Sequence, residues 1–371
     1  MHIGIDAIGV KHSGGSMVLL QFIAALLRSE AISRITVFTS PRNKRDFDLP
    51  LSPKLEEEIC SIAENSYFMR TVWWIYLIAK RCKQRGVHIL VSMSGMGHAS
   101  RTIPHITLVQ QSNPFSSESF KLQQARGKLQ FLVMLAMMRF SCRKAARVFV
   151  QTPTMREWVC AAFRLPRLAI DVFLPCSPPF PPEDPHLLPN FPMLTSLASH
   201  SILYVGSDSR HKNLALIVNA MKSICSILPR ATLFATLPAN HPVCDGLSVV
   251  GLGHLARTHL YQAYKHATVL VLPSLVETVG LPLLEAIAIG TPVLAADRPY
   301  AHDVCEDAAV FFDPLDEDDY VRKLLGILEN SELRSEMIEK GHRLVTRRIG
   351  ERPYERMVTR IVEIALGQHE N

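Results

Sequence analysis

The chain has 371 residues, 48% of them apolar and 20% charged, and a formal net charge of +6 at pH 7. The apolar share is too high and the net charge too small for a disordered chain, and the length suggests two domains of ordinary size. Residues 1–6 lack the basic and apolar segments of a signal peptide, and no stretch is long and apolar enough to predict a membrane-spanning helix.

Charge is distributed unevenly between the two halves of the chain. Residues 1–180 contain 23 Lys and Arg against 11 Asp and Glu, a net of +12, whereas residues 181–371 contain 17 against 23, a net of −6. The first half is therefore expected to meet something acidic, such as a membrane surface, a phosphorylated substrate or a nucleic acid.

Short apolar runs alternate with longer helical patterns along the whole chain. Strands are predicted in the first half at residues 3–8, 35–39, 87–92, 106–109 and 148–151. They are predicted in the second half at residues 202–205, 231–235, 247–250, 267–272, 292–295 and 309–312. Helices at residues 16–28 and 214–227 each follow the first strand of their half. This alternation predicts parallel sheets covered on both faces, and hence an α/β protein with two Rossmann-like domains.

A proline-rich run separates the two series of elements. It covers residues 174–182 and continues through Pro185, Pro189 and Pro192. Because proline cannot continue a helix or donate to a strand ladder, the run predicts an extended connector. We place the boundary there, which gives an N-terminal domain of residues 1–180 and a C-terminal domain from residue 181. Ligands of such domains bind beyond the carboxyl ends of the strands, so the cleft between the two domains is the expected site.

A glycine-rich loop, residues 9–16, joins the first strand to its helix. Gly14 and Gly15 let the backbone approach a ligand closely, and the N–H groups of a helix start attract anions. The loop does not have the G-x-G-x-x-G spacing of dinucleotide-binding proteins. It is therefore either a phosphate-binding loop or only a tight strand-to-helix turn.

A basic loop, residues 204–213, occupies the corresponding position in the second half. Arg210 and Lys212 lie next to the positive end of a predicted helix, for which Asn213 is the expected N-cap. Two cations there repel each other unless a negative group lies between them, and a diphosphate would supply it. The alternative is a solvated basic turn.

Two glutamates mark the segment of residues 271–295. Glu277 lies in the loop after a predicted strand, a helix is predicted to start near Gly280, and Glu285 is the one charged residue in that otherwise apolar helix. A buried carboxylate costs several kcal/mol unless it finds partners, and paired hydroxyls of a ligand are suitable ones.

Glu277 and Glu285, with seven residues between them and followed by Gly-Thr-Pro-Val, resemble the Glu-x7-Glu signature of retaining GT-B glycosyltransferases, specifically glycosyltransferase family 4. Further matching positions come in the family's order: Gly14, Gly15, Arg210, Lys212, Asp313 and Pro314. The carboxyl half matches well and the amino half weakly. The resemblance implies the GT-B fold, with two parallel sheets that face each other across an interdomain cleft. It also implies that residues 354–371 form a C-terminal helix crossing back to the N-terminal domain, which leaves residues 181–353 as the donor domain.

The resemblance also implies roles for the residues of the second half. Arg210 and Lys212 would hold the diphosphate of a nucleotide-sugar donor, Glu277 would face the donor sugar, and Glu285 would bind the ribose hydroxyls. Backbone N–H groups would cover the phosphate and sugar at Thr278, Val279, Gly280 and Leu281. The base would lie near Leu252 and Gly253. Gly14 and Gly15 would contribute to the donor site from the first half.

The acceptor side departs from the family's pattern. Many relatives have a histidine after the strand at residues 106–109, where this chain has Gln111 and Asn113. These amides can hydrogen-bond a sugar or acceptor but cannot act as a base. The transfer would then proceed by front-face attack, with the departing phosphate taking the acceptor's proton, unless another base such as His98 serves; a structural role for His98 is the alternative.

Two segments combine apolar or aromatic residues with basic ones. They are residues 67–85, which include Trp73 and Trp74, and residues 126–147. Each is either a contact with an anionic membrane surface or a core helix with an exposed basic end. Membrane docking would suit a lipid-linked acceptor.

No metal or other cofactor is expected. The eight cysteines are scattered, which indicates reduced thiols in a cytoplasmic protein. Asp46 with Asp48, and Asp316 with Asp318, have Asp-x-Asp spacing, but we interpret the first pair as part of a polar loop and the second as complementing a helix dipole.

The sequence thus predicts a retaining glycosyltransferase that moves a sugar from a UDP- or GDP-sugar to a hydroxyl acceptor. The acceptor would be a saccharide, and in particular a lipid-linked one of surface polysaccharide or lipopolysaccharide biosynthesis, with the protein in the cytoplasm or on the inner face of the plasma membrane. The alternative is a non-catalytic nucleotide-sugar-binding subunit of another transferase. A nucleic-acid partner is disfavoured because no known binding module is present, and a dehydrogenase because no dinucleotide motif follows a strand.

Overall fold

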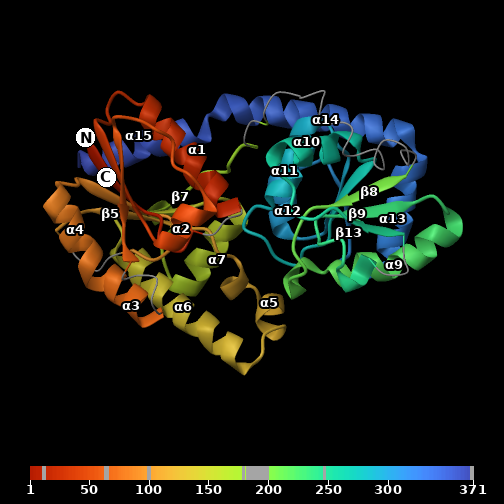
Figure 1. Cartoon of the computed structure of the whole chain (residues 1–371), viewed down its shortest axis with the longest axis horizontal. Helices are drawn as coiled ribbons and strands as arrows, with labels where there is room; N and C mark the ends of the chain where they lie inside the picture. The colour runs from red at the N-terminus through yellow and green to blue at the C-terminus, as the bar shows by residue number, and fades with distance from the viewer. Residues whose placement is uncertain are drawn as a thin grey trace. The chain divides into compact units, whose positions relative to one another are not determined.

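The computed structural model describes residues 1–10, 14–61, 67–97, 102–177, 180, 200–244 and 248–367. The chain divides into two compact units (Figure 1). The first consists of Met1–Pro175 together with Glu351–Asn371, and the second of Cys176–Gly350. Residues 181–199 of the proline-rich run lie outside the described residues.

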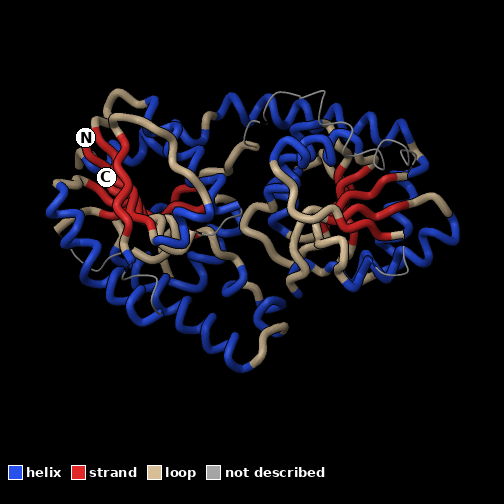
Figure 2. Tube along the Cα trace, in the orientation of Figure 1, coloured by secondary structure: helices blue, strands red, loops and turns tan. Residues whose placement is uncertain are grey.

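The first unit is built on a parallel sheet of seven strands in the order β3-β2-β1-β4-β5-β6-β7 (Figure 2). The strands are β1 (His2–Asp6), β2 (Arg34–Thr39), β3 (Leu55–Ile59), β4 (Ile89–Ser92), β5 (His105–Val109), β6 (Arg147–Val150) and β7 (Ile170–Val172). The chain enters the sheet at its centre, winds outward to β3, and returns through β4 to the other edge, which is a doubly wound topology.

Helices cover both faces of this sheet. The helical elements are α1 (Gly14–Arg28), α2 (Pro41–Asp46), α3 (Tyr67–Val72), η2 (Trp73–Leu77), α4 (Ile78–Arg85), η3 (Asn113–Phe115), α5 (Ser117–Lys121), α6 (Ala125–Lys144), α7 (Pro153–Phe163), η4 (Arg167–Ala169) and α15 (Pro353–Ala365). One apolar cluster joins Ile3, Ile5 and Phe149 to α1 and α15; the other joins Leu90, Val148 and neighbouring residues to η2, α4, α6 and α7. Phe149 and Val148 fall in different clusters because successive strand residues point to opposite faces.

The second unit contains a parallel sheet of six strands in the order β10-β9-β8-β11-β12-β13. The strands are β8 (Ser201–Tyr204), β9 (Thr232–Ala235), β10 (Val249–Gly251), β11 (Val269–Leu272), β12 (Val293–Ala296) and β13 (Val310–Phe312). The helical elements are η6 (Arg210–Lys212), α9 (Leu214–Ile227), η7 (Pro242–Cys244), α10 (Arg257–His266), α11 (Leu281–Ile289), α12 (Pro299–Cys305), α13 (Glu317–Glu329) and α14 (Ser331–Glu351). Two parallel-sheet α/β units confirm the predicted fold class.

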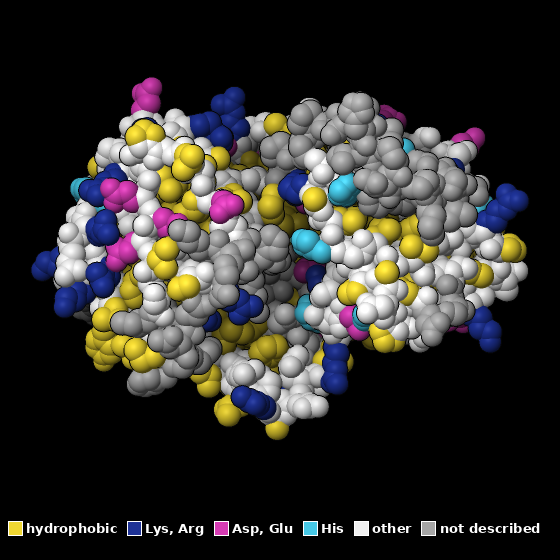
Figure 3. Space-filling view, in the orientation of Figure 1, with side chains coloured by type: hydrophobic (Ala, Val, Ile, Leu, Met, Phe, Trp, Pro, Cys, Tyr) yellow, Lys and Arg dark blue, Asp and Glu magenta, His cyan; other side chains and the backbone are white. Residues whose placement is uncertain are grey.

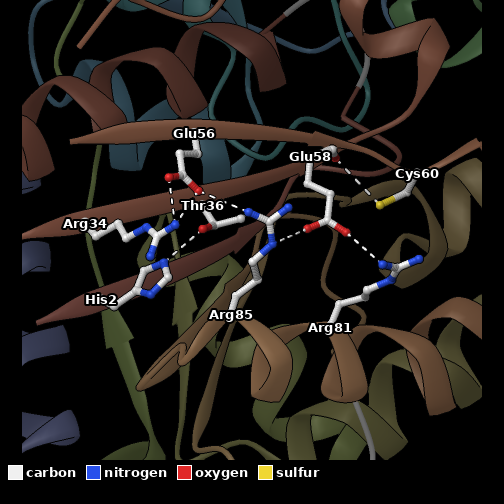
Figure 4. A network of polar contacts seen from close by, with 8 residues as sticks. All are labelled: His2, Arg34, Thr36, Glu56, Glu58, Cys60, Arg81 and Arg85. Carbon is white, nitrogen blue, oxygen red and sulfur yellow. Dashed lines mark hydrogen bonds and ion pairs between the residues drawn. The ribbon is translucent and has the colours of Figure 1, made fainter. Parts of the chain in front are cut away.

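The sheet edge at β3 was not predicted from the sequence. Its residues, Leu55-Glu56-Glu57-Glu58-Ile59, carry three consecutive acidic side chains. Figure 4 shows the partners of two of them: Glu56 pairs with Arg34 and Arg85 at 2.7 and 3.1 Å, and Glu58 with Arg85 and Arg81 at 3.0 and 3.6 Å. The third, Glu57, accepts a hydrogen bond from the hydroxyl of Thr39 at 2.7 Å. Charge on an edge strand also discourages pairing with another chain.

The aromatic segment, for which a membrane contact and a core helix were both left open, has its two tryptophans in the core. Trp73 and Trp74 are each 2% exposed and pack in the cluster that also contains Phe38 and Ile78. Trp74 Nε1 donates to Asp6 Oδ2 at 2.9 Å, so the indole ties η2 to the end of β1. The membrane interpretation is therefore wrong for the two tryptophans, whose large apolar area is better buried against the sheet.

Asp6 is a fully buried carboxyl group at the carboxyl end of β1. It accepts hydrogen bonds from the backbone N–H of Ile8 and the indole of Trp74, yet burial raises its pKa to about 7. A carboxylate without water is costly even when it accepts two hydrogen bonds. Between pH 4 and 7 the folded protein therefore binds more protons than the unfolded one, and its stability decreases as the pH rises.

We expect Asp6→Asn to remove this dependence. We compare the unfolding free energy of the wild type with that of Asp6→Asn at each pH. The difference, wild type minus variant, should decrease by up to about 1.4 kcal/mol per pH unit between pH 5 and 7. Above pH 8 it should stay constant. Urea unfolding at several pH values measures it, with Asp48→Asn at an exposed site as the control. Parallel curves for wild type and Asp6→Asn would contradict the assignment.

Candidate functional site

The predicted donor residues lie along the carboxyl edge of the six-stranded sheet. Strands β8 and β11 are neighbours and run parallel, so the loops that follow them meet. The backbone N–H of Leu275 donates to the carbonyl of His211 at 2.8 Å, which joins the loop after β11 to the η6 turn. His211 and Leu275, more than sixty positions apart in the sequence, are therefore in direct contact.

Lys212 and Glu277 form an ion pair across these two loops. The Lys212 ammonium donates to Glu277 Oε1, and their side chains are 18% and 15% exposed. A ligand diphosphate was the negative group considered for the basic turn. In the structure the carboxylate of Glu277 already provides a negative charge there. Arg210 lies on the same turn and is exposed. Burial, followed by the charge of Lys212, lowers the pKa of His211 between them.

Asn213 departs from the prediction that it caps the following helix. It occupies the N-cap position of α9 with φ 53°, in the left-handed region, and its side chain makes no capping hydrogen bond. Instead its Nδ2 donates to the carbonyl of Pro314 at 2.8 Å. The side chain therefore fastens the η6 turn to the turn after β13.

Gly280 ends the loop that contains Glu277 and is the N-cap of α11. Its φ of 74° is unfavourable for other residues, and a Cβ would come within 3.1 Å of Leu272 and 3.2 Å of Leu283. Pro282 has no N–H, and the N–H of Leu283 donates to the carbonyl of Gly280. Backbone donors for a ligand are thus restricted to Thr278–Leu281, and the buried Val279 can contribute only its backbone.

Glu285 is buried in α11, as its apolar surroundings predict, but it already has partners. Its Oε1 lies 3.0 Å from Nη1 of Arg257, and its Oε2 accepts from the hydroxyl of Tyr264 at 2.9 Å. Burial raises the pKa of Glu285, while Arg257 and Tyr264 counteract that shift. The partners that a buried carboxylate was expected to need are thus supplied in part by the protein, and the carboxylate retains lone pairs for further donors such as ligand hydroxyls.

Arg257 and Tyr264 were missed by sequence reasoning. Both lie on α10, 28 and 21 residues before Glu285, and nothing in their local pattern links them to it. The Arg257 guanidinium also stacks 4.2 Å over the ring of Phe180, which in turn lies 5.5 Å from the ring of Tyr261. Arg257 thus supports Glu285 while being held from its other side.

Leu252 and Gly253, the predicted base-binding positions, follow β10. Their N–H groups donate to the carbonyls of Ala235 and Leu237 at 2.8 and 2.7 Å. Gly251 before them passes so close to residues 237–239 that a Cβ would lie 2.6 Å from the carbonyl of Pro238. A base at this position would therefore contact the carbonyl or side chain of Leu252, not these two amides.

The candidate residues of the first unit lie at the carboxyl ends of its strands. Gly14 and Gly15 are the first two residues of α1, and residues 11–13 of their loop lie outside the described residues. Gln111 follows β5, and Asn113 begins η3, where its Oδ1 accepts from the hydroxyl of Ser119 at 3.1 Å. His98 lies outside the described residues.

Comparisons with known proteins bear on the family and the fold. Residues 247–344 match the family model described as "Glycosyl transferases group 1". The chain is 32% identical over 152 residues to the sulfoquinovosyl transferase SQD2 of Arabidopsis thaliana and 33% identical over 124 residues to the O-antigen chain mannosyltransferase RfbU of Salmonella typhimurium. These matches cover 38% and 31% of this chain but only 29% and 35% of the two relatives, about a third of their length.

Solved structures match over the whole chain. Sucrose-phosphate synthase from Thermosynechococcus elongatus superposes with a TM-score of 0.77 at 17% identity, covering 100% of both chains. HepE of Anabaena, in complex with UDP and glucose, superposes with a TM-score of 0.71 at 13% identity, covering 98% of this chain and 99% of its own. At such identities the likeness establishes the fold. Taken together, these findings show that residues 247–344, which contain both Glu277 and Glu285, have the sequence pattern of the group 1 glycosyl transferases, and that the chain as a whole has the GT-B fold.

Proposed function

We propose that this protein is a retaining glycosyltransferase that moves a sugar from a nucleotide diphosphate sugar to a hydroxyl acceptor. The observation that carries the proposal is the Lys212–Glu277 pair, held at the carboxyl edge of the second sheet beside the turn at Gly280. A cation, a carboxylate and backbone donors at one sheet edge are the groups needed to bind a sugar diphosphate.

Lys212 and Arg210 would bind the diphosphate and neutralise the charge that develops on it as its bond to the sugar breaks. Lys212 is paired with Glu277 in the structure, so donor binding would give it a second anion. Glu277 would face the sugar hydroxyls, and the backbone of residues 278–281 would cover phosphate and sugar. The departing phosphate would take the proton of the acceptor hydroxyl as the new glycosidic bond forms on the same face.

Glu285 would accept hydrogen bonds from the ribose hydroxyls. Arg257 and Tyr264 each hold one of its oxygens, so its carboxylate is fixed in orientation before a ligand arrives. Fixing a side chain in advance reduces the entropy lost on binding. The base would rest against Leu252.

The first unit would bind the acceptor, with Gln111 and Asn113 as hydrogen-bonding groups and the Gly14–Gly15 turn reaching toward the donor. We retain residues 1–180 and 181–353 as acceptor and donor domains, and 354–371 as the C-terminal helical segment. In the described part, α15 packs on α1 within the first unit.

The relatives support the proposed donor and acceptor classes. HepE is described with UDP and glucose, and RfbU as an O-antigen chain mannosyltransferase. We therefore propose a UDP- or GDP-sugar donor and a lipid-linked saccharide acceptor of surface polysaccharide or lipopolysaccharide synthesis. The cytoplasm, or the cytoplasmic face of the plasma membrane, is the proposed location, consistent with eight free thiols. The second candidate, a non-catalytic nucleotide-sugar-binding subunit, is supported by the amides of Gln111 and Asn113, neither of which can act as a base.

Lys212→Ala should reduce kcat/KM for the donor by roughly 100-fold, because the cation at the leaving diphosphate is lost. Donor binding by thermal shift and initial rates with the nucleotide sugar it selects measure the effect. Lys222→Ala, at an exposed position of α9, is the matched control and should be unchanged.

A second variant separates two roles of Lys212. If Lys212 only neutralised Glu277, then Lys212→Ala combined with Glu277→Gln would restore donor binding. We expect no restoration. Recovery to the wild-type level would remove Lys212 from the diphosphate site, and donor binding without turnover in the wild type would favour the non-catalytic candidate.

Glu285→Gln and Tyr264→Phe test the ribose assignment as a pair. Glu285→Gln removes the charge that pairs with Arg257, and Tyr264→Phe removes one hydrogen bond to the carboxylate, so each should lower the unfolding free energy by about 1–3 kcal/mol. Only Glu285→Gln changes the group that would accept from the ribose, and it should raise KM for the donor roughly 10-fold more than Tyr264→Phe does. Equal donor KM in the two variants would assign Glu285 a purely structural role.

A further inference from the structure

Helix α6 is covered by the rest of the first unit along only a narrow strip. Of its 20 residues, Met138, Ser141 and Cys142 are buried. The opposite side exposes four large apolar side chains: Leu129 at 62%, Leu132 at 54%, Val133 at 40% and Phe140 at 47%. Their spacing of three, four and eleven residues from Leu129 places them on one face of the helix. We call these four residues the α6 stripe.

All charged residues of α6 are basic. The helix contains Arg126, Lys128, Arg139, Arg143 and Lys144 and no acidic residue. Arg126 lies one turn before the first residue of the stripe, and Lys144 one turn after its last, so basic side chains bracket the apolar ones along the axis. In Figure 3 hydrophobic and basic side chains occur together on the margin of the molecule that α6 occupies in Figure 1.

A second element of the same layer adds to this surface. Trp74, Ile78 and Cys82 of η2 and α4 are buried in the same apolar cluster as Met138 and Cys142 of α6, so both elements cover one face of the sheet. On η2 the side chain of Tyr76 is 69% exposed, and on α4 that of Lys83 is exposed. The outer side of the layer therefore presents apolar and basic groups from two elements.

We propose that the α6 stripe docks on an anionic lipid bilayer, with α6 lying in the plane of the interface. Apolar side chains bracketed by lysine and arginine fit the boundary between acyl chains and anionic headgroups. A second copy of this chain is a poorer occupant, because its α6 would bring five more basic residues against these. The inference rests on the proposed function only in that docking would present a lipid-linked acceptor to the first unit.

Co-sedimentation of the full chain with vesicles tests the proposal. We expect binding to vesicles of phosphatidylcholine mixed with phosphatidylglycerol, weak binding to phosphatidylcholine alone, and loss of binding at high salt. Leu132→Ser with Val133→Ser should weaken binding roughly tenfold or more, and Arg126→Gln with Lys144→Gln should weaken it on anionic vesicles only.

Matched controls separate docking from general effects of composition. Leu168→Ser removes an apolar side chain of the first unit that is 87% exposed and lies outside α6. The double variant Lys222→Gln with Arg230→Gln removes two exposed charges of the second unit. Both control variants should bind vesicles as the wild type does. Far-ultraviolet circular dichroism confirms that each variant is folded.

Three results would overturn the proposal: no sedimentation of the wild type with anionic vesicles, equal sedimentation of the stripe variant and its control, or a dimer in sedimentation velocity that the stripe variant abolishes. Thermal shift with nucleotide sugars needs no vesicle. If the stripe variants fail to bind vesicles but show the same thermal shift with nucleotide sugars as the wild type, the loss concerns docking and not the donor site.

Discussion

The ion pair between Lys212 and Glu277 is the interaction on which the proposed site depends. Both side chains are more than four-fifths covered, and each alone at this depth would carry an unbalanced charge. Parallel neighbouring strands β8 and β11 deliver the two loops to one edge, and the backbone bond from Leu275 to His211 fixes their separation. The pair itself is neutral, so the two negative charges of a nucleotide sugar diphosphate would be met by Lys212 together with the exposed Arg210 on the same turn.

Glu285, the second carboxylate of the candidate site, lies in a different environment. Glu285 lies within an apolar helix, and its two oxygens are held separately by Arg257 and Tyr264. Tyr264 is fully buried and its backbone carbonyl accepts from Thr291 Oγ1, so the support extends to the end of α11. Two glutamates with seven residues between them thus occupy contrasting environments, one partly exposed and paired with lysine, the other buried in a fixed orientation. This contrast fits one group that meets the reacting sugar and one that only holds the nucleotide.

Sequence pattern predicted most of the fold because the central strands, such as β4 and β11, are short buried runs of Val, Leu and Ile between turns. It failed at β3, whose three glutamates look like a solvated loop and become a strand only through arginines from β2 and α4. It left a membrane contact and a core helix open at Trp73 and Trp74, since composition does not tell a core face from an exposed one. At the candidate site it identified Glu277 and Glu285 by their spacing, but not Arg257 or Tyr264, because contacts across helices leave no local pattern. At residues 126–147 the sequence left a membrane contact and a core helix open, and only the exposure of the α6 stripe favours the first.

The central claim is that a nucleotide sugar binds on the carboxyl edge of the six-stranded sheet, over the Lys212–Glu277 pair. Hydrogen–deuterium exchange of the wild-type chain with and without the nucleotide sugar that stabilises it tests this directly, because it reports where the ligand lies without relying on turnover. The account predicts slower exchange in the loops of residues 205–213 and 273–281, with no comparable change in β3 or at the exposed ends of α13. Protection confined to other segments, with these two loops unchanged, would contradict it.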